Sequence, residues 1–367
     1  MKRFIFAIAF VSAFLSLTLR ADRVDKYVKA EMEQRGIPGL SLVIVRDGKT
    51  TKNAAYGFAN LELKSPVKPE TVFEIGSVTK QFTAACILML QQDGKLSVDD
   101  KIGKHFPEIP ESWSNVTIRH LLNHTSGIRS YTGLTGFELT KKLTQKQFIT
   151  ELWELPLEFT PGEKYKYCNS GYSLLGYIVE NVSGKNYWEF LGGRIFAPLG
   201  MTTATNREPS IIVPNRADGY EKKRDGTRIN RDYDLTDVFA AGAIVSTAGD
   251  LAKWNASLDT NKILSDASKL AMWTTGKLNS GQETEYGLGW RVGSHLGHKN
   301  VGHSGSTSGF SASLQRFPED NLTVILLCNS GEEGVATVLA KQIASFFSSI
   351  KNSEMIYRFD FRETPYC

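Results

Sequence analysis

The stretch that decides the fold is FEIGSVTKQFTAACILML, residues 73–90. Its apolar residues recur at the spacing of a helix, which predicts a largely buried helix that begins near Ser77. Ser77 and Lys80 are three residues apart and therefore lie on one face of that helix. A serine hydroxyl is a weak nucleophile, and a lysine whose pKa is lowered by burial can take its proton. The N–H groups at the helix start would favour a developing oxyanion.

The same spacing also fits an ordinary helix start. Serine is a good N-cap and lysine is common on surfaces, so the Ser77–Lys80 pair alone does not identify a nucleophile. The catalytic interpretation therefore depends on partners elsewhere in the chain.

A first set of partners is Tyr167-Cys168-Asn169, which ends a segment rich in Gly, Pro and Asn and precedes a helix predicted over residues 172–181. A loop tyrosine can present its phenol to a cleft, where nearby cations lower its pKa and let it act as a base or proton relay. Asn169 offers both a donor and an acceptor to a substrate amide. A packed aromatic residue beside a turn asparagine is the alternative interpretation.

A second set lies in GHSGSTSGF, residues 302–310, just before a predicted strand. Its Gly and Ser content predicts backbone that approaches a ligand closely, with N–H groups that could complete an oxyanion hole and His303 as a polar substrate contact. The start of this stretch is also similar to a G-x-S-x-G nucleophile elbow around Ser304. That pattern needs glycine where Ser306 stands, and it needs a helix where a strand is predicted.

The remaining pattern places strands near both ends of the chain and helices between them. An antiparallel sheet built from both ends, with a helical region inserted, is the simplest α+β architecture. The predicted helices are residues 22–36, 118–122, 145–155, 172–181, 187–196 and 335–347, and the predicted strands are residues 40–45, 49–58, 287–292, 310–317 and 322–328.

The first 21 residues differ from the rest. Lys2 and Arg3 precede an apolar run that is short for a membrane span, which predicts an export signal and a periplasmic or secreted protein. An uncleaved anchor, the one case in which we expect contact with a membrane, is the alternative.

The cysteine positions and the net charge limit which kinds of site and partner are expected. Cys86 and Cys328 lie in apolar runs and are predicted to be buried free thiols, so we expect no disulfide framework, and the cysteine spacing fits no metal site. The net charge of +4 is spread along the chain without a basic tract, so we expect no nucleic-acid partner.

The three motifs SVTK (77–80), YCN (167–169) and HSG (303–305), in this order, resemble those of the class C β-lactamase-like serine hydrolases. That family includes β-lactamases, DD-peptidases, D-aminopeptidases and esterases. HLLNHTSG (120–127), TPG (160–162) and PLGM (198–201) are also similar to it. The resemblance covers roughly residues 25 to 348.

The resemblance implies a β-lactamase/transpeptidase-like fold: an antiparallel sheet flanked by helices, with an inserted all-helical domain and the site between them. The expected division is a signal peptide at 1–21, an α/β part at about 22–84 and 240–350, a helical part at about 85–239, and a tail at 351–367.

It also implies roles for individual residues. Ser77 would be acylated, Lys80 and Tyr167 would share the proton transfers, and Asn169 would hold the substrate amide. The backbone N–H groups of Ser77 and Ser306 would form the oxyanion hole, with His303 and Gly305 beside them as substrate-binding residues. No metal or cofactor is implied.

One motif departs from the β-lactamase pattern, because His303 stands where those enzymes carry lysine. A neutral histidine lacks the fixed charge that attracts a substrate carboxylate. This favours a peptidase- or esterase-like enzyme with a small-molecule or peptide substrate. A true β-lactamase and a catalytically silent binding protein on the same scaffold are the alternatives.

Overall fold

The computed structural model describes residues 22–134, 144–226, 228–230 and 235–347. Within them, the two ends of the chain build one antiparallel sheet, with the strand order β3-β2-β1-β12-β11-β10-β9. β1 pairs with β12 along its length, with Val43 opposite Ile325, so the early hairpin joins the late strands. The α+β architecture expected from the sequence is therefore confirmed. The bounds are β1 Gly39–Arg46, β2 Lys49–Asn60, β3 Ser65–Pro66, β9 Arg291–His295, β10 His298–Thr307, β11 Phe310–Phe317 and β12 Leu322–Cys328.

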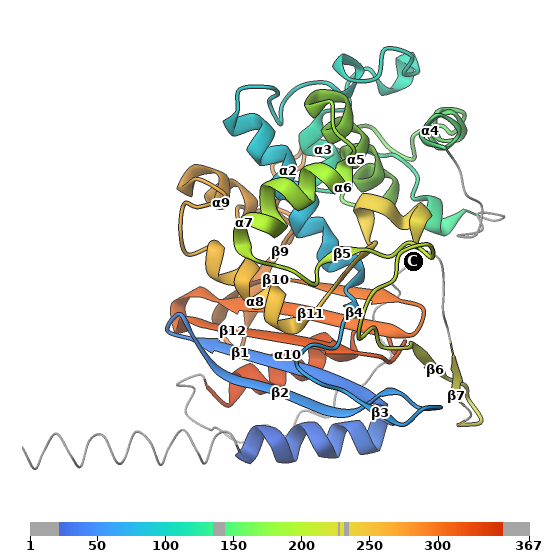
Figure 1. Ribbon diagram of the computed structural model, residues 1–367. Coiled ribbons are helices and arrows are strands. Elements are labelled where there is room, and N and C mark those ends of the chain that lie inside the picture. The colour runs from blue at the N-terminus through green and yellow to red at the C-terminus, as the bar shows by residue number, and fades with distance from the viewer. Residues whose placement is uncertain (1–21, 135–143, 227, 231–234, 348–367) are drawn as a thin grey trace, which may run out of the picture.

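Both faces of the sheet are covered. Leu40, Leu42 and Ile44 of β1 pack on one side, with the helix at residues 22–35 and α10 (Val335–Ser345). Val43 and Val45 point to the other side and join the core shared with the helical region. This period of two is the alternation of a strand buried on both faces. Figure 1 shows the sheet between these two layers, with the 22–35 helix at the bottom of the view.

The helical region lies above the sheet in Figure 1 and contains most of the chain between the two groups of strands. Two short sheets, β4-β8-β5 and β6-β7, accompany it. The remaining bounds are α2 Thr79–Gln92, α3 Ile118–Leu122, α4 Gln145–Trp153, α5 Asn169–Ser183, α6 Tyr187–Leu191, α7 Ala197–Leu199, α8 Ala248–Ser257, α9 Asp266–Met272, β4 Phe73–Glu74, β5 Thr205–Asn206, β6 Tyr220–Lys222, β7 Arg228–Asn230 and β8 Ile244–Ser246.

The helix α2 is the centre of the molecule. Every residue from Thr79 to Leu90 is buried, as expected for a helix that is enclosed on all sides. Ser77 lies in the short turn η1 (Gly76–Val78) just before it. Ser77 is partly exposed although its neighbours on both sides are buried. The fold thus brings one serine to the surface at the start of its most buried helix.

The structure corrects three predicted elements. The strand predicted at 287–292 is β9, residues 291–295, because Gly289 has φ +79° and a Cβ there would lie 2.7 Å from the Lys80 carbonyl oxygen. The Gly-rich segment at 302–307 is itself part of strand β10 rather than a loop before one. The helix predicted from 172 already begins at Asn169.

Some expectations concern residues that are not described. The predicted export signal at 1–21 and the tail at 351–367, with Cys367, lie outside the described residues. In the part that is described, no helix has the length and apolar character needed to cross a bilayer. The predicted boundary at 84–85 falls inside α2, and the division into two parts stays a prediction.

Candidate active site

Ser77 and Lys80 meet as the spacing predicts. The Lys80 Nζ lies 3.1 Å from Ser77 Oγ, 2.8 Å from Asn169 Oδ1 and 2.7 Å from the Ala241 carbonyl oxygen. The Lys80 side chain is fully buried, and its Nζ also lies 4.8 Å from the centre of the Tyr167 ring. One amine therefore connects the three segments that carry Ser77, Asn169 and Ala241.

The surroundings of Lys80 favour its neutral form. Burial lowers the pKa of Lys80 well below its ordinary value, and nearby Arg291 lowers it further. A neutral amine has two N–H donors and one lone pair. Asn169 Oδ1 and the Ala241 carbonyl can only accept, so they take the two N–H groups, and the lone pair is left for the Ser77 hydroxyl. This is the arrangement of a base that removes the serine proton.

The Tyr167 phenol lies in the same group, but its pKa shifts in the direction opposite to the one expected. Burial raises the pKa of Tyr167, and this outweighs the lowering by Ser77 and Arg291. Its hydroxyl is enclosed, and the Ser77 side chain is the neighbour that most favours its ionised form. The lowered pKa expected from the sequence is not found, and of the two expected roles, base or proton relay, a neutral phenol that relays a proton fits the site better.

Asn169 is held from two sides. Its Oδ1 accepts from Lys80 and its Nδ2 donates to Thr132 Oγ1 at 3.1 Å, while its backbone N–H donates to Ser130 Oγ at 3.1 Å. Ser170 in turn donates to the Arg129 carbonyl at 2.7 Å. The segment at 129–132 thus fixes the start of α5 and the orientation of the Asn169 amide.

The two N–H groups expected to form an oxyanion hole belong to two backbone segments in close contact. A Cβ on Gly305 would lie 1.9 Å from the Ile75 carbonyl oxygen and 2.9 Å from the Ser77 nitrogen, and one on Gly76 would lie 2.8 Å from the Ser306 nitrogen. Two facing glycines therefore let β10 and η1 approach closely enough to bring the Ser77 and Ser306 N–H groups together.

The structure places His303 behind the cleft rather than on its surface. Its side chain is buried, and burial lowers its pKa well below the ordinary value, so it is neutral. The Ser304 carbonyl, 2.5 Å from Nδ1, can only accept, so Nδ1 carries the proton. Nε2 then accepts from the Tyr286 hydroxyl at 2.8 Å. His303 does not line the cleft as a substrate contact, and it braces β10 next to the oxyanion hole.

These residues surround a cleft of about 600 Å³ that is lined by Ser77, Tyr167, Asn169, Ser304 and Ser306. Ser304 reaches the cleft from strand β10, and the ring of His303 contacts the Ser304 backbone carbonyl rather than its hydroxyl. The nucleophile-elbow alternative for Ser304 therefore lacks both its base and its strand-to-helix turn.

The three cysteines in the described part of the chain do not line the cleft. Cys86, Cys168 and Cys328 are buried free thiols, which confirms the expectation for Cys86 and Cys328. Among the described residues, no group of three or more His, Cys, Asp or Glu side chains could hold a metal ion.

Four residues of the site were not found from the sequence: Thr132, Ala241, Tyr286 and Arg291. Ala241 acts through its backbone, which no side-chain pattern reports. Arg291 lines the cleft and lies over the Tyr167 ring, with its guanidinium carbon 5.8 Å from the ring centre. Tyr286 lies in the YGLGW run (286–290), where an aromatic residue beside two glycines was the available signal.

The chain is similar to proteins of known families. The family model described as Beta-lactamase matches residues 24–346. Penicillin-binding protein 4* of Bacillus subtilis is 31% identical over 313 residues, which are 80% of this chain and 68% of that protein. Protein flp of Staphylococcus aureus is 30% identical over 85% of this chain and 64% of its own length, so the chain spans about two thirds of these relatives. The D-amino acid amidase of Ochrobactrum anthropi SV3, solved with L-phenylalanine amide, has a TM-score of 0.75 at 26% identity, covering 86% of this chain and 95% of the amidase chain.

Proposed function

The chain belongs to the β-lactamase family of serine hydrolases, and we propose that it is an exported hydrolase that forms an acyl-enzyme at Ser77. The observation that carries the proposal is the fully buried Lys80, whose Nζ lies 3.1 Å from Ser77 Oγ. Export rests on the charged and apolar pattern of residues 1–21.

The acylation step uses these residues in order. Neutral Lys80 takes the Ser77 proton as Oγ attacks the substrate carbonyl, and the N–H groups of Ser77 and Ser306 bind the oxyanion. Each well-placed donor of this kind contributes about 3 kcal/mol to the barrier reduction. The tetrahedral intermediate collapses, and the leaving group receives a proton from Lys80 through the Tyr167 hydroxyl. Water then releases the acyl group by the same steps in reverse.

The substrate class we propose is a small amide or ester, cleaved as by a peptidase or esterase rather than a β-lactamase. Buried, neutral His303 gives the cleft no fixed charge from the third motif. Among the described residues, the cations that line the cleft are Arg129, Lys166 and Arg291, and Lys166 is paired with Glu158 at 2.7 Å. Arg291 is the one beside Tyr167, where a carboxylate or carbonyl of the substrate could approach.

The test compares wild type with Ser77→Ala on D-phenylalanine amide, a p-nitrophenyl ester and benzylpenicillin. We expect Ser77-dependent hydrolysis of the amide or the ester, and with benzylpenicillin a slowly released adduct seen by intact mass. Rapid consumption of penicillin without an adduct would favour the β-lactamase alternative. No reaction with any of the three, or equal turnover by Ser77→Ala, would refute the proposal.

A further inference from the structure

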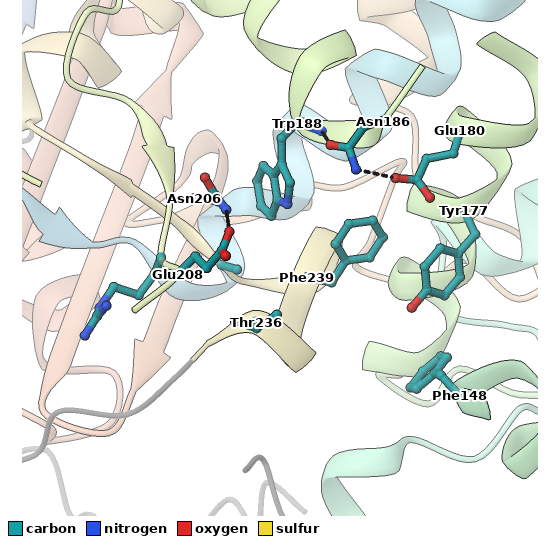
Figure 2. Close-up of a pocket in the computed structure, with 11 residues that line it drawn as sticks. Phe148, Tyr177, Glu180, Asn186, Trp188, Asn206, Glu208, Thr236 and Phe239 are labelled. Carbon is teal, nitrogen blue, oxygen red and sulfur yellow. Dashed lines mark hydrogen bonds between the residues drawn. The ribbon is translucent and has the colours of Figure 1, made fainter. Parts of the chain in front are cut away.

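A second cavity of about 280 Å³ lies apart from the catalytic cleft, and among the described residues none lines both. Three aromatic rings, Tyr177, Trp188 and Phe239, form part of its wall. In Figure 2 the rings of Trp188 and Phe239 lie between Glu208 on one side and Glu180 on the other.

The walls of the cavity suit a small organic cation. Glu180 and Glu208 bring two carboxylates, and the remaining charged wall residue, Arg207, forms an ion pair with Glu74 at 3.5 Å. Burial raises the pKa of Glu180, which indicates that its carboxylate is poorly hydrated. Trp188 offers the ring type that attracts cations most strongly.

The carboxylates are also held in place. Asn186 Nδ2 donates to Glu180 Oε1 at 3.1 Å, and Asn206 Nδ2 donates to Glu208 Oε2 at 3.3 Å, as the dashed lines in Figure 2 mark. Two fixed carboxylates around aromatic rings form a site that is organised before a ligand arrives, which reduces the cost of binding.

One residue of the cavity wall, Phe239, is close in the chain to a carbonyl that binds the Lys80 amine. Phe239 has φ 44° and ψ −131°, a conformation that is disfavoured for a residue with a side chain. Two residues on, the Ala241 carbonyl accepts from Lys80 at 2.7 Å. The Ala240 carbonyl accepts from Thr83 of α2 at 2.6 Å. The disfavoured backbone conformation at Phe239 therefore determines where the next carbonyls lie, and these carbonyls accept hydrogen bonds from Thr83 and Lys80 of α2.

A second wall residue, Arg207, is connected through Glu74 to the strand that carries Ser306. Arg207 lines the cavity and pairs with Glu74, and Glu74 accepts a hydrogen bond from Thr307 Oγ1 at 2.6 Å. Thr307 directly follows Ser306 on β10. Two residues of the cavity wall, Phe239 and Arg207, are therefore connected to the catalytic site through two separate sets of contacts.

We propose that this cavity is an effector site for a small organic cation, and that its occupancy raises the rate of acylation at Ser77. A ligand packed on Phe239 stabilises the arrangement of the structure, in which the Ala241 carbonyl accepts a hydrogen bond from Lys80. By linkage, a ligand that prefers this state increases its population. The binding half stands by itself, whereas the kinetic half rests on the proposed function.

The probe is benzyltrimethylammonium chloride, which has no nucleophile that could attack an acyl-enzyme. Calorimetry on the full chain should show one site, both before and after Ser77 is blocked with a fluorophosphonate. Trp188→Ala and Glu208→Gln should weaken binding several-fold. Glu158→Gln, which changes a carboxylate of the catalytic cleft instead, is the matched control and should leave it unchanged.

The kinetic readout is the rate at which a fluorophosphonate labels Ser77, with the probe or with an equal concentration of sodium chloride. We expect a rise of about five-fold or more, the lower end of usual coupling between two sites. In Glu208→Gln, the ratio of the labelling rate with the probe to the rate without it should fall toward one.

Three results would overturn the proposal: no binding at millimolar concentration, binding that disappears once Ser77 is blocked, or binding without a change in labelling rate. If Ser77 is not labelled at all, the proposed function fails, and calorimetry still decides whether the cavity binds the cation.

Discussion

The substitution Gly305→Ala tests how the oxyanion hole is built. The new Cβ would lie 1.9 Å from the Ile75 carbonyl oxygen, while ordinary contact begins near 3.4 Å, so β10 and η1 must separate by about 1.5 Å. Backbone carbonyls cannot rotate away as a flexible side chain can. The separation moves the Ser306 N–H relative to the Ser77 N–H, which are the two expected donors.

The magnitude follows from known cases. Displacement of a reacting group by about 1 Å costs about 100-fold in rate, and loss of one oxyanion donor costs about 10²–10³ in kcat. We therefore expect kcat to fall about 100-fold or more. Overpacking destabilises a core by about 1–3 kcal/mol, which a domain stable by about 5–15 kcal/mol survives.

The assay is Ser77-dependent hydrolysis of a p-nitrophenyl ester, corrected with Ser77→Ala, beside the free energy of unfolding from urea titration. Gly302→Ala is the matched control, because Gly302 lies on the same strand as Gly305 but away from Ser77. Its Cβ would lie 2.5 Å from the Leu314 carbonyl oxygen of β11. Both variants should lose similar stability, and only Gly305→Ala should lose most of its activity. Wild-type kcat in folded Gly305→Ala, or an equal loss in Gly302→Ala, would refute this reasoning.

Three further changes probe the groups around Ser77. Tyr167→Phe removes the proton relay and should lower kcat by about 10²–10⁴ in ester hydrolysis, with unchanged stability; a fall of less than five-fold would contradict a relay. Lys80→Met should abolish labelling and alter the pH dependence of stability. Because the pKa of Lys80 is lowered in the folded state, the unfolded chain binds more protons between that lowered pKa and about 10.5. The stability of wild type should therefore rise with pH relative to Lys80→Met in that range, and parallel urea-derived curves between about pH 7 and 10 would count against a depressed pKa. Tyr286→Phe removes the donor to His303 Nε2 and should cost about 1 kcal/mol of stability with a smaller loss of kcat than Gly305→Ala; an equal loss of kcat would show that His303 acts in the cleft.

Much of the fold followed from local patterns in the sequence. The strands predicted at 40–45, 49–58 and 322–328 lie where the structure has β1, β2 and β12. The elements that were misplaced are those where contacts distant in sequence decide the conformation. Gly289 bends the chain because it packs on the Lys80 carbonyl, which no spacing within residues 287–292 reports.

The candidate site, like the fold, could be predicted only where local sequence decides the geometry. The Ser77–Lys80 pair could be predicted, since three residues in a helix fix their relation. The protonation of Tyr167 could not, because burial is a property of the assembled core and here outweighs the nearby charges. His303 is a polar residue that was expected to contact the substrate. Because side chains alternate along β10, His303 points into the core, whereas Ser304 and Ser306 point toward the cleft.

The most direct test of the central claim, that Ser77 is the nucleophile, is peptide mapping after reaction with a fluorophosphonate. Wild type, Ser77→Ala and Ser304→Ala are compared by intact mass, and the label is then located. We expect one adduct at Ser77 in wild type and in Ser304→Ala, and none in Ser77→Ala. A label on Ser304, undiminished labelling of Ser77→Ala, or no label on folded wild type would contradict the claim.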